Sequence, residues 1–221
     1  RWEGTAVGTS TCWGEGATEN EVVVTGLLED LVSRGVNPKR RRLFVIDGSK
    51  ALRAAIDAVF GTSNPVQRCR NHKVRNVLGH LPEEHRREME LVMKAAYRLD
   101  AQEGMEKLRT KAKWLEKDYP SAAASLLEGL EETFTVSRLG LPSALRRCLC
   151  TTNIIENPQR GVRMRTRRVT RWRDGQMVMR WAATAFLHAE KSFRRVMGYD
   201  ELWMLRAALG DKVIDKGKEA A

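Results

Sequence analysis

A short apolar run that ends in an acid, followed by an amphipathic segment, constrains the fold of this chain more than any other feature. The run is Leu43-Phe-Val-Ile46, and Asp47-Gly48 follows directly. Over residues 50–60 the apolar side chains recur at helical spacing, and Gly61 ends the pattern. The sequence therefore predicts a buried strand, a turn and a helix, as in α/β proteins. Active-site groups collect at the carboxyl ends of strands in open α/β sheets, so Asp47 is a candidate functional residue. The alternative is that it only caps the helix or forms the turn.

Most of the remaining chain carries the apolar spacing of helices. Helices are predicted after a capping box at Thr18–Glu21 and over most of residues 71–132, with starts at Pro82, Asp100 and Pro120. Further helices are predicted near Asn157 and over residues 176–195 and 199–209, a second short strand over residues 65–69, and a tail over residues 211–221. The expected fold is α/β but helix-rich overall.

Charge and composition limit the function classes. The chain of 221 residues has a formal net charge of +11, and between residues 160 and 180 it has eight arginines and a single acid, Asp174. Clustered positive charge favours an anionic partner, most commonly nucleic acid; the alternative is a basic protein without such a partner. No segment reaches the roughly 18 consecutive apolar residues that would suggest a membrane span. The first residues lack a secretory signal and the cysteines lack the spacing of a disulfide framework, so a cytoplasmic location is expected.

A second candidate acid, Glu156, stands just ahead of the arginine cluster. A carboxylate on a basic surface suits an enzyme that holds a metal ion against a nucleic-acid phosphate. Because Mg²⁺ and Mn²⁺ prefer carboxylate oxygens, Asp47 and Glu156 are candidate ligands of a two-metal site. The alternative is that Glu156 is a surface acid paired with Arg160, one helical turn later.

The arginine cluster is the candidate DNA-binding surface. At helical spacing Arg163 and Arg167 share one face, and Arg160 and Arg171 are in register with them, as a stripe that follows a phosphate backbone would require. The candidate residues are Arg160, Arg163, Arg165, Arg167, Arg168 and Arg171. Trp172 and Trp181 occur in the same segment, and we interpret them as core or rim aromatics rather than as platforms for bases.

Cys69 and His72 place a thiol and an imidazole three residues apart. This spacing alone is a weak zinc signal, since structural zinc usually takes four ligands. A nucleophilic Cys–His pair is also weakly supported, because no third orienting group stands out.

Three motifs occur in order along the chain. They are Val45-Ile-Asp47-Gly48-Ser-Lys50-Ala-Leu52, Gln67-Arg-Cys69-Arg-Asn-His72-Lys73-Val-Arg75-Asn76-Val77-Leu78, and Thr152-Asn153-Ile-Ile-Glu156 followed by an Arg-x-Arg-Thr sequence. In order and rough spacing they resemble the Mutator-like transposases of bacterial insertion sequences, as does Trp172-Arg-Asp-Gly-Gln-Met177. The resemblance covers about residues 14–209.

The resemblance implies an RNase H-like catalytic core with a metal-binding Asp-Asp-Glu triad. Asp47 matches the second acid and Glu156 the third, with two Mg²⁺ or Mn²⁺ ions as the expected cofactor, whereas zinc is not expected. Cys69 and His72 match a Cys-x-x-His element of the family, with a structural or DNA-contacting role. The expected domains are the first part of the core over residues 1–70, a helical insertion over 71–150, the rest of the core with a basic helix over 151–210, and a tail over 211–221.

The activity implied by the resemblance is DNA transposition. The reaction is metal-dependent hydrolysis of a DNA phosphodiester, followed by attack of the freed 3′-hydroxyl on target DNA. The implied partners are double-stranded DNA, as element ends and as target, and further copies of the same protein. The implied location is the bacterial cytoplasm, in association with the nucleoid.

Two departures from the family pattern matter. No Asp precedes Asp30, which sits in the middle of a predicted helix, so the first acid of the triad has no match. The chain is therefore expected to be truncated at the N-terminus and inactive by itself; the alternative is a non-catalytic remnant that binds DNA or co-assembles with an intact transposase. After Glu156 the sequence reads Asn157-Pro158, and Pro158 is expected in the first turn of a helix that begins near Asn157.

Overall fold

The strand–turn–helix unit predicted around Asp47 is present in the structure. A computed structural model describes residues 21–210 of the chain. Helix α1 spans Glu21–Ser33, strand β1 Phe44–Ile46, helix α2 Lys50–Phe60 and strand β2 Val66–Arg68. These elements confirm the two helices and the two strands predicted here, whereas the start of the capping box at Thr18 lies outside the described residues.

Strands β1 and β2 pair in parallel, with Ile46 opposite Arg68. The backbone N–H of Cys69 continues the ladder by donating to the Ile46 carbonyl at 2.7 Å. Parallel strands need a long crossover connection, and the connection here contains α2. Within residues 21–210 this pair is the whole of the β-sheet structure. The helix-rich fold is therefore confirmed, and the RNase H-like core stays a prediction.

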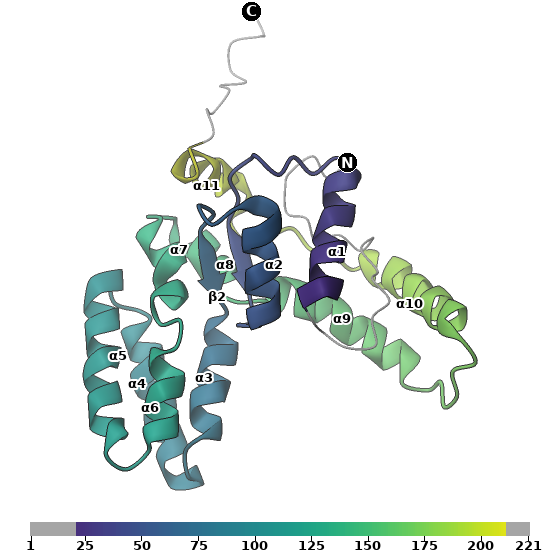
Figure 1. Ribbon diagram of the computed structural model, residues 1–221. Coiled ribbons are helices and arrows are strands. Elements are labelled where there is room, and N and C mark those ends of the chain that lie inside the picture. The colour runs from purple at the N-terminus through teal and green to yellow at the C-terminus, as the bar shows by residue number, and fades with distance from the viewer. Residues whose placement is uncertain (1–20, 211–221) are drawn as a thin grey trace, which may run out of the picture. The chain divides into compact units, whose positions relative to one another are not determined.

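The described chain divides into two compact units. The first consists of residues 21–39, 50–62 and 152–196, and the second of residues 40–49, 63–151 and 197–210. In the first unit α1 packs against α2, and helix α9 (Asn153–Thr166) packs against helix α10 (Gly175–Glu190) (Figure 1). The predicted domain limits at residues 70, 150 and 210 stay predictions.

Four helices of the second unit form a bundle. They are α3 (Arg70–Gly79), α4 (Glu83–Ala96), α5 (Ala101–Glu116) and α6 (Pro120–Leu127), which lie side by side in Figure 1. Their inward faces bury Met93, Leu108 and Leu126 completely, together with Phe134 from the turn that follows α6. The bundle confirms the almost wholly helical region predicted over residues 71–132.

Shorter elements complete the second unit. They are the 3₁₀ helix η1 (Glu131–Phe134), α7 (Thr135–Arg138), α8 (Ser143–Leu149), the 3₁₀ helix η2 (Tyr199–Glu201) and α11 (Leu202–Ala208). A small second core contains Val136 of α7 and Leu145 of α8, and Leu202 packs against it. Elements η2 and α11 confirm the short helix predicted over residues 199–209. In the described part of the chain, no helix has both the length and the apolar character needed to cross a bilayer.

Local sequence signals set the helix starts of the bundle where they were predicted. Pro82 immediately precedes α4, and Pro120 is the first residue of α6. Asp100 caps α5, because its carboxylate accepts hydrogen bonds from the backbone N–H groups of Glu103 at 3.0 Å and Gln102 at 2.8 Å. These bonds favour the ionised carboxylate and so lower the pKa of Asp100, and the bond from Glu103 has the larger effect.

Two predicted helix boundaries in the C-terminal part are wrong. Helix α9 begins at Asn153, ahead of the predicted start near Asn157, so Pro158 lies inside the helix and not in its first turn. The carbonyl of Thr152, the residue before α9, accepts the first hydrogen bonds of the helix, and this contact outweighs the preference of proline for a first turn. Helix α10 ends at Glu190, short of the predicted end at Arg195.

Candidate active site and nucleic-acid surface

Asp47 stands at the carboxyl end of β1 with its side chain exposed. The carboxylate oxygen Oδ1 accepts a hydrogen bond from the backbone N–H of Ser49 at 3.0 Å. The other oxygen makes no hydrogen bond or ion pair with any residue in the described range 21–210. One oxygen thus shapes the turn before α2, while the other faces solvent and is able to bind a cation. The turn role and the ligand role of Asp47 are compatible.

Two residues of the second sequence motif fasten the strand pair to the turn that follows the bundle. The fully buried Gln67 donates from Nε2 to the carbonyl of Thr133 at 2.9 Å and accepts from the backbone N–H of Val136 at 2.8 Å. Arg70 donates from Nε to the same Thr133 carbonyl at 2.9 Å and from Nη2 to the Ser137 hydroxyl at 2.8 Å. These bonds hold the end of β2 in a fixed place within its unit.

Aromatic rings and burial complete the surroundings of Arg70. Its guanidinium lies 4.6 Å from the centre of the Tyr97 ring and 5.3 Å from that of Phe134, distances at which a cation attracts a ring face. Burial of the guanidinium lowers the pKa of Arg70, and burial of the phenol raises the pKa of Tyr97 to about 12. Arg70 is thus a structural cation inside the unit and is not available to a phosphate.

Lys73 is also used internally, although it belongs to the most basic motif. Its side chain is buried, and its Nζ donates to the backbone carbonyls of Ser125 and Glu128. Burial, followed by the nearby charge of Arg68, lowers the pKa of Lys73 to about 8. The lysine therefore ties α3 to the end of α6 and does not contribute to the basic surface.

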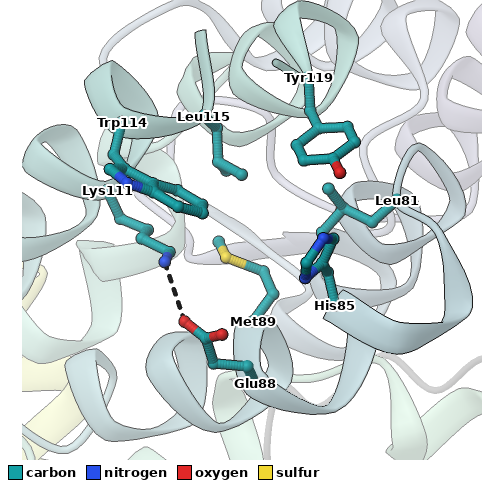
Figure 2. Close-up of a pocket in the computed structure, with 8 residues that line it drawn as sticks. All are labelled: Leu81, His85, Glu88, Met89, Lys111, Trp114, Leu115 and Tyr119. Carbon is teal, nitrogen blue, oxygen red and sulfur yellow. Dashed lines mark hydrogen bonds and ion pairs between the residues drawn. The ribbon is translucent and has the colours of Figure 1, made fainter. Parts of the chain in front are cut away.

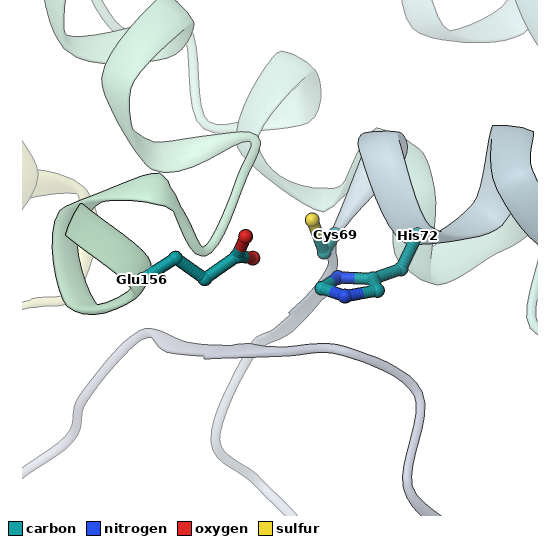
Figure 3. Close-up of side chains that lie close together, drawn as sticks. All are labelled: Cys69, His72 and Glu156. Carbon is teal, nitrogen blue, oxygen red and sulfur yellow. The ribbon is translucent and has the colours of Figure 1, made fainter. Parts of the chain in front are cut away.

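Cys69 and His72 lie on either side of the start of α3 (Figure 3). Cys69 is fully buried and His72 is half-buried. The thiol sulfur and an imidazole nitrogen lie within 4.8 Å of each other. The backbone N–H of Cys69 extends the β-ladder, which is a structural contribution. The predicted structural or DNA-contacting role of the pair stays a prediction, as does the expectation against zinc.

Glu156 belongs to the first turn of α9 in the other unit (Figure 3). The hydroxyl of Thr152, at the N-terminus of the same helix, donates to the Oε1 oxygen of Glu156. Glu156 is half-buried and Thr152 is buried, so the hydroxyl holds the carboxylate against its own helix end. A carboxylate in the first turn also lies at the positive end of the helix dipole.

The six candidate DNA-binding arginines are all exposed, and none forms an ion pair with another residue of the described range 21–210. Their predicted arrangement as one helical stripe is wrong, because α9 ends at Thr166. Arg160, Arg163 and Arg165 lie on the helix, whereas the other three lie in the segment that joins α9 to α10. The positive charge is thus spread over a helix end and a following irregular segment.

Comparison with known protein families accounts for most of the chain. The profile of the Mutator family of transposases matches residues 12–195. The chain belongs to this family. A comparison with curated proteins found no match. A transposase function and an interaction with DNA follow from the family, and the sequence motifs that indicated the family all lie within the matched residues.

Two exposed tryptophans of this transposase lie in its basic segment. Trp172 is 40% exposed and Trp181 is 43% exposed, so neither is a core residue. A core position is therefore wrong for both, and their interpretation as rim aromatics rather than platforms for bases stays a prediction. Sequence alone could not decide between them, because an aromatic beside arginines occurs both at a core edge and on a nucleic-acid surface.

A shallow pocket in the helical bundle of the transposase has a different character. It lies between α4 and α5 and is lined mainly by apolar and aromatic side chains (Figure 2). Its charged residues pair with each other, since Lys111 lies 3.1 Å from Glu88 and 3.8 Å from the centre of the Trp114 ring. His85 and Tyr119 meet edge to face with ring centres 5.5 Å apart. The polar groups are thus satisfied by one another, and we assign the pocket a packing role.

Proposed function

We propose that this transposase binds Mg²⁺ or Mn²⁺ through the carboxylates of Asp47 and Glu156 and uses the metal to cut and join DNA. The observation that carries the proposal is the exposed carboxylate of Asp47 at the end of a parallel strand. One of its oxygens accepts the hydrogen bond from Ser49, and the other has no partner among the described residues. Carboxylate oxygens are the donors that these hard cations prefer, so the residues fit the ion. Family membership supports the same chemistry.

In the proposed reaction, bound divalent ions would supply stabilisation of the entering and leaving oxygens of the phosphodiester. The protein holds the ligands in place beforehand: Ser49 orients Asp47, and Thr152 orients Glu156. Such preorganisation is a large source of rate enhancement in phosphoryl transfer. We assign strands β1 and β2 to an RNase H-like core on the strength of the family resemblance.

The exposed arginines are proposed to hold the DNA backbone. Arg160, Arg163 and Arg165 on α9, with Arg167, Arg168 and Arg171 after it, present six positive charges that form no ion pair among the described residues. Charges of this kind contact phosphates and give affinity without sequence preference. We also propose assembly of at least two copies on DNA, since joining reactions bring two ends together.

The inactivity expected of the chain by itself stays a prediction, and Mn²⁺-dependent nicking of supercoiled plasmid by the parent tests it first. The variants Asp47→Asn and Glu156→Gln are then compared with the parent. We expect each variant to lose at least about 100-fold in cleavage rate while its affinity for DNA stays within about two-fold of the parent. Asp118→Asn, which changes an exposed acid of the bundle, is the matched control and should cleave like the parent. Full cleavage by Asp47→Asn would refute the assignment.

A second candidate function is DNA binding without cleavage. It is favoured by the basic segment, whose six exposed arginines are able to contact phosphates whether or not Asp47 holds a metal. Under this alternative the parent shows no metal-dependent cleavage, and Glu156→Ala binds DNA as well as the parent or better, because a negative charge has left a basic surface. The plasmid assay and a binding titration therefore separate the two functions.

A further inference from the structure

Arg68 occupies a special place beside the loop that carries Asp47. It is the last residue of β2 and pairs directly with Ile46, the last residue of β1. In a parallel pair the two chains leave the sheet side by side at this edge. The side chain of Arg68 is only 11% exposed, which is low for a guanidinium. Burial is costly for a donor without a partner, and its Nε makes no hydrogen bond within the described residues.

The guanidinium joins two backbone segments that are far apart in the sequence. Nη2 donates to the carbonyl of Gly48 at 3.1 Å, directly after Asp47. Nη1 donates to the carbonyl of Glu128 at 2.9 Å. Arg68 thus fastens the loop after β1 to the end of α6 within the same unit. A planar fork with several donors makes such a double contact, which the single ammonium of lysine cannot reproduce.

Two glycines with positive φ let the backbone approach Arg68 this closely. Gly48 has φ 113°, and a Cβ there would lie 3.2 Å from Nε of Arg68. Gly129 has φ 59°, and a Cβ there would lie 2.6 Å from Nη1. Both positions therefore favour glycine for conformation and for space, and the guanidinium is enclosed between two backbone turns.

The charge of Arg68 is paired with two glutamates of its own unit. Its Nη2 lies 3.4 Å from Oε1 of Glu128, and its Nε lies 3.7 Å from Oε2 of Glu132. No ion pair joins Arg68 to Asp47 among the described residues. Two glutamates thus balance the guanidinium, while the open oxygen of Asp47 stays available to a cation.

From these contacts we propose that Arg68 is a positioning residue, which holds the Gly48 carbonyl and thereby fixes the orientation of Asp47 for metal binding. The inference rests on the proposed function of Asp47 as a ligand. Groups that orient metal ligands typically contribute about 10- to 100-fold to metal affinity. Arg68 acts through the backbone and is not itself a ligand.

The experiment compares Arg68→Lys with Arg70→Lys in the full chain. Arg70 is the matched control, because it is a largely buried arginine two residues further along the chain. Its guanidinium donates to the carbonyls of Thr133 and Tyr97 and to the Ser137 hydroxyl, and it makes no contact with the Asp47 loop. Two quantities are measured for each variant: the hydrogen-exchange rate of the Ser49 amide, which donates to Asp47, and the affinity for Mn²⁺ by electron paramagnetic resonance. Asp47→Asn serves as the reference for loss of the ligand, and a thermal melt records the stability of each variant.

We expect Arg68→Lys to speed exchange at Ser49 and to weaken Mn²⁺ binding by about 10-fold, while Arg70→Lys lowers the melting temperature without either effect. Unchanged Ser49 exchange in Arg68→Lys overturns the positioning role. Faster exchange with Mn²⁺ affinity equal to the parent overturns its link to the metal. If Asp47→Asn binds Mn²⁺ like the parent, the proposed function fails, and the exchange data still decide whether Arg68 positions the loop.

Discussion

At the scale of single residues, the most basic motif of the sequence serves mainly the interior. Gln67, Arg68, Arg70 and Lys73 all reach backbone carbonyls that belong to a segment after the bundle or to its last turn. Sequence reasoning drew attention to Cys69 and His72 in this motif and missed these four residues. In the sequence, these residues stand out only because no acidic residue lies near them. A basic cluster on the surface shows the same pattern.

Lys73 gives a prediction about pH. Because burial lowers its pKa in the folded state from the ordinary 10.5 to about 8, the unfolded chain binds more protons between these values, and stability rises with pH. Burial raises the pKa of the Cys150 thiol, so this group acts in the opposite direction over part of the same range. We therefore expect the free energy of unfolding by urea, taken as the difference between the parent and Lys73→Met, to increase between about pH 8 and 9.5. Lys94→Met, at an exposed position, should keep the pH profile of the parent. A difference between the parent and Lys73→Met that does not change with pH would contradict the assignment.

At the scale of elements, caps and apolar periodicity explain most helices, and α9 is the exception. It carries Pro158 in its interior, where the ring removes the N–H that would otherwise donate to the carbonyl of Ile154. No side chain of α9 is fully buried, although the helix packs against α10. The helix that carries Glu156 is therefore weakened at the turn next to the acid.

Pro158→Ala should stabilise α9 because it restores the missing hydrogen bond. We expect a gain of about 1 to 3 kcal/mol in the unfolding of this unit, seen as a higher melting temperature by circular dichroism. Pro120→Ala is the control: Pro120 is the first residue of α6, where no intrahelical bond is lost, and its replacement should bring no gain. Equal effects of the two substitutions would show that Pro158 does not disturb the helix.

At the scale of the whole molecule, positive charge is the dominant property. The net charge of +11 is concentrated in the arginine-rich segment from Arg160 onward, whereas the bundle helices mix both signs, with exposed pairs such as Arg109 and Glu131 at 2.9 Å. A basic surface of this kind binds DNA chiefly through release of counterions, so its affinity depends steeply on salt.

The salt dependence can be predicted from the arginines. Six phosphate contacts give a slope of log K against log salt of about −5, and each lost contact makes the slope less negative by about 1. We therefore expect the slope for Arg163→Gln to be less negative by about 1, measured by fluorescence anisotropy with a duplex. Arg87→Gln, at an exposed position of α4, should leave the slope unchanged. An equal decrease for both variants would indicate that the charge acts without a defined surface.

The sequence by itself determined the family, the strands β1 and β2, and the helix starts at Pro82, Asp100 and Pro120. These features depend on side chains within a few residues of one another, such as the carboxylate of Asp100 and the amides one turn later. Only the tertiary structure decided that α9 begins before Pro158, that the arginines leave the helix at Thr166, and that Arg68 reaches both Gly48 and Glu128. The bond from Arg68 to Glu128 joins segments 60 residues apart. No local pattern encodes it, because a buried arginine and a surface arginine look alike until the chain has folded around one of them.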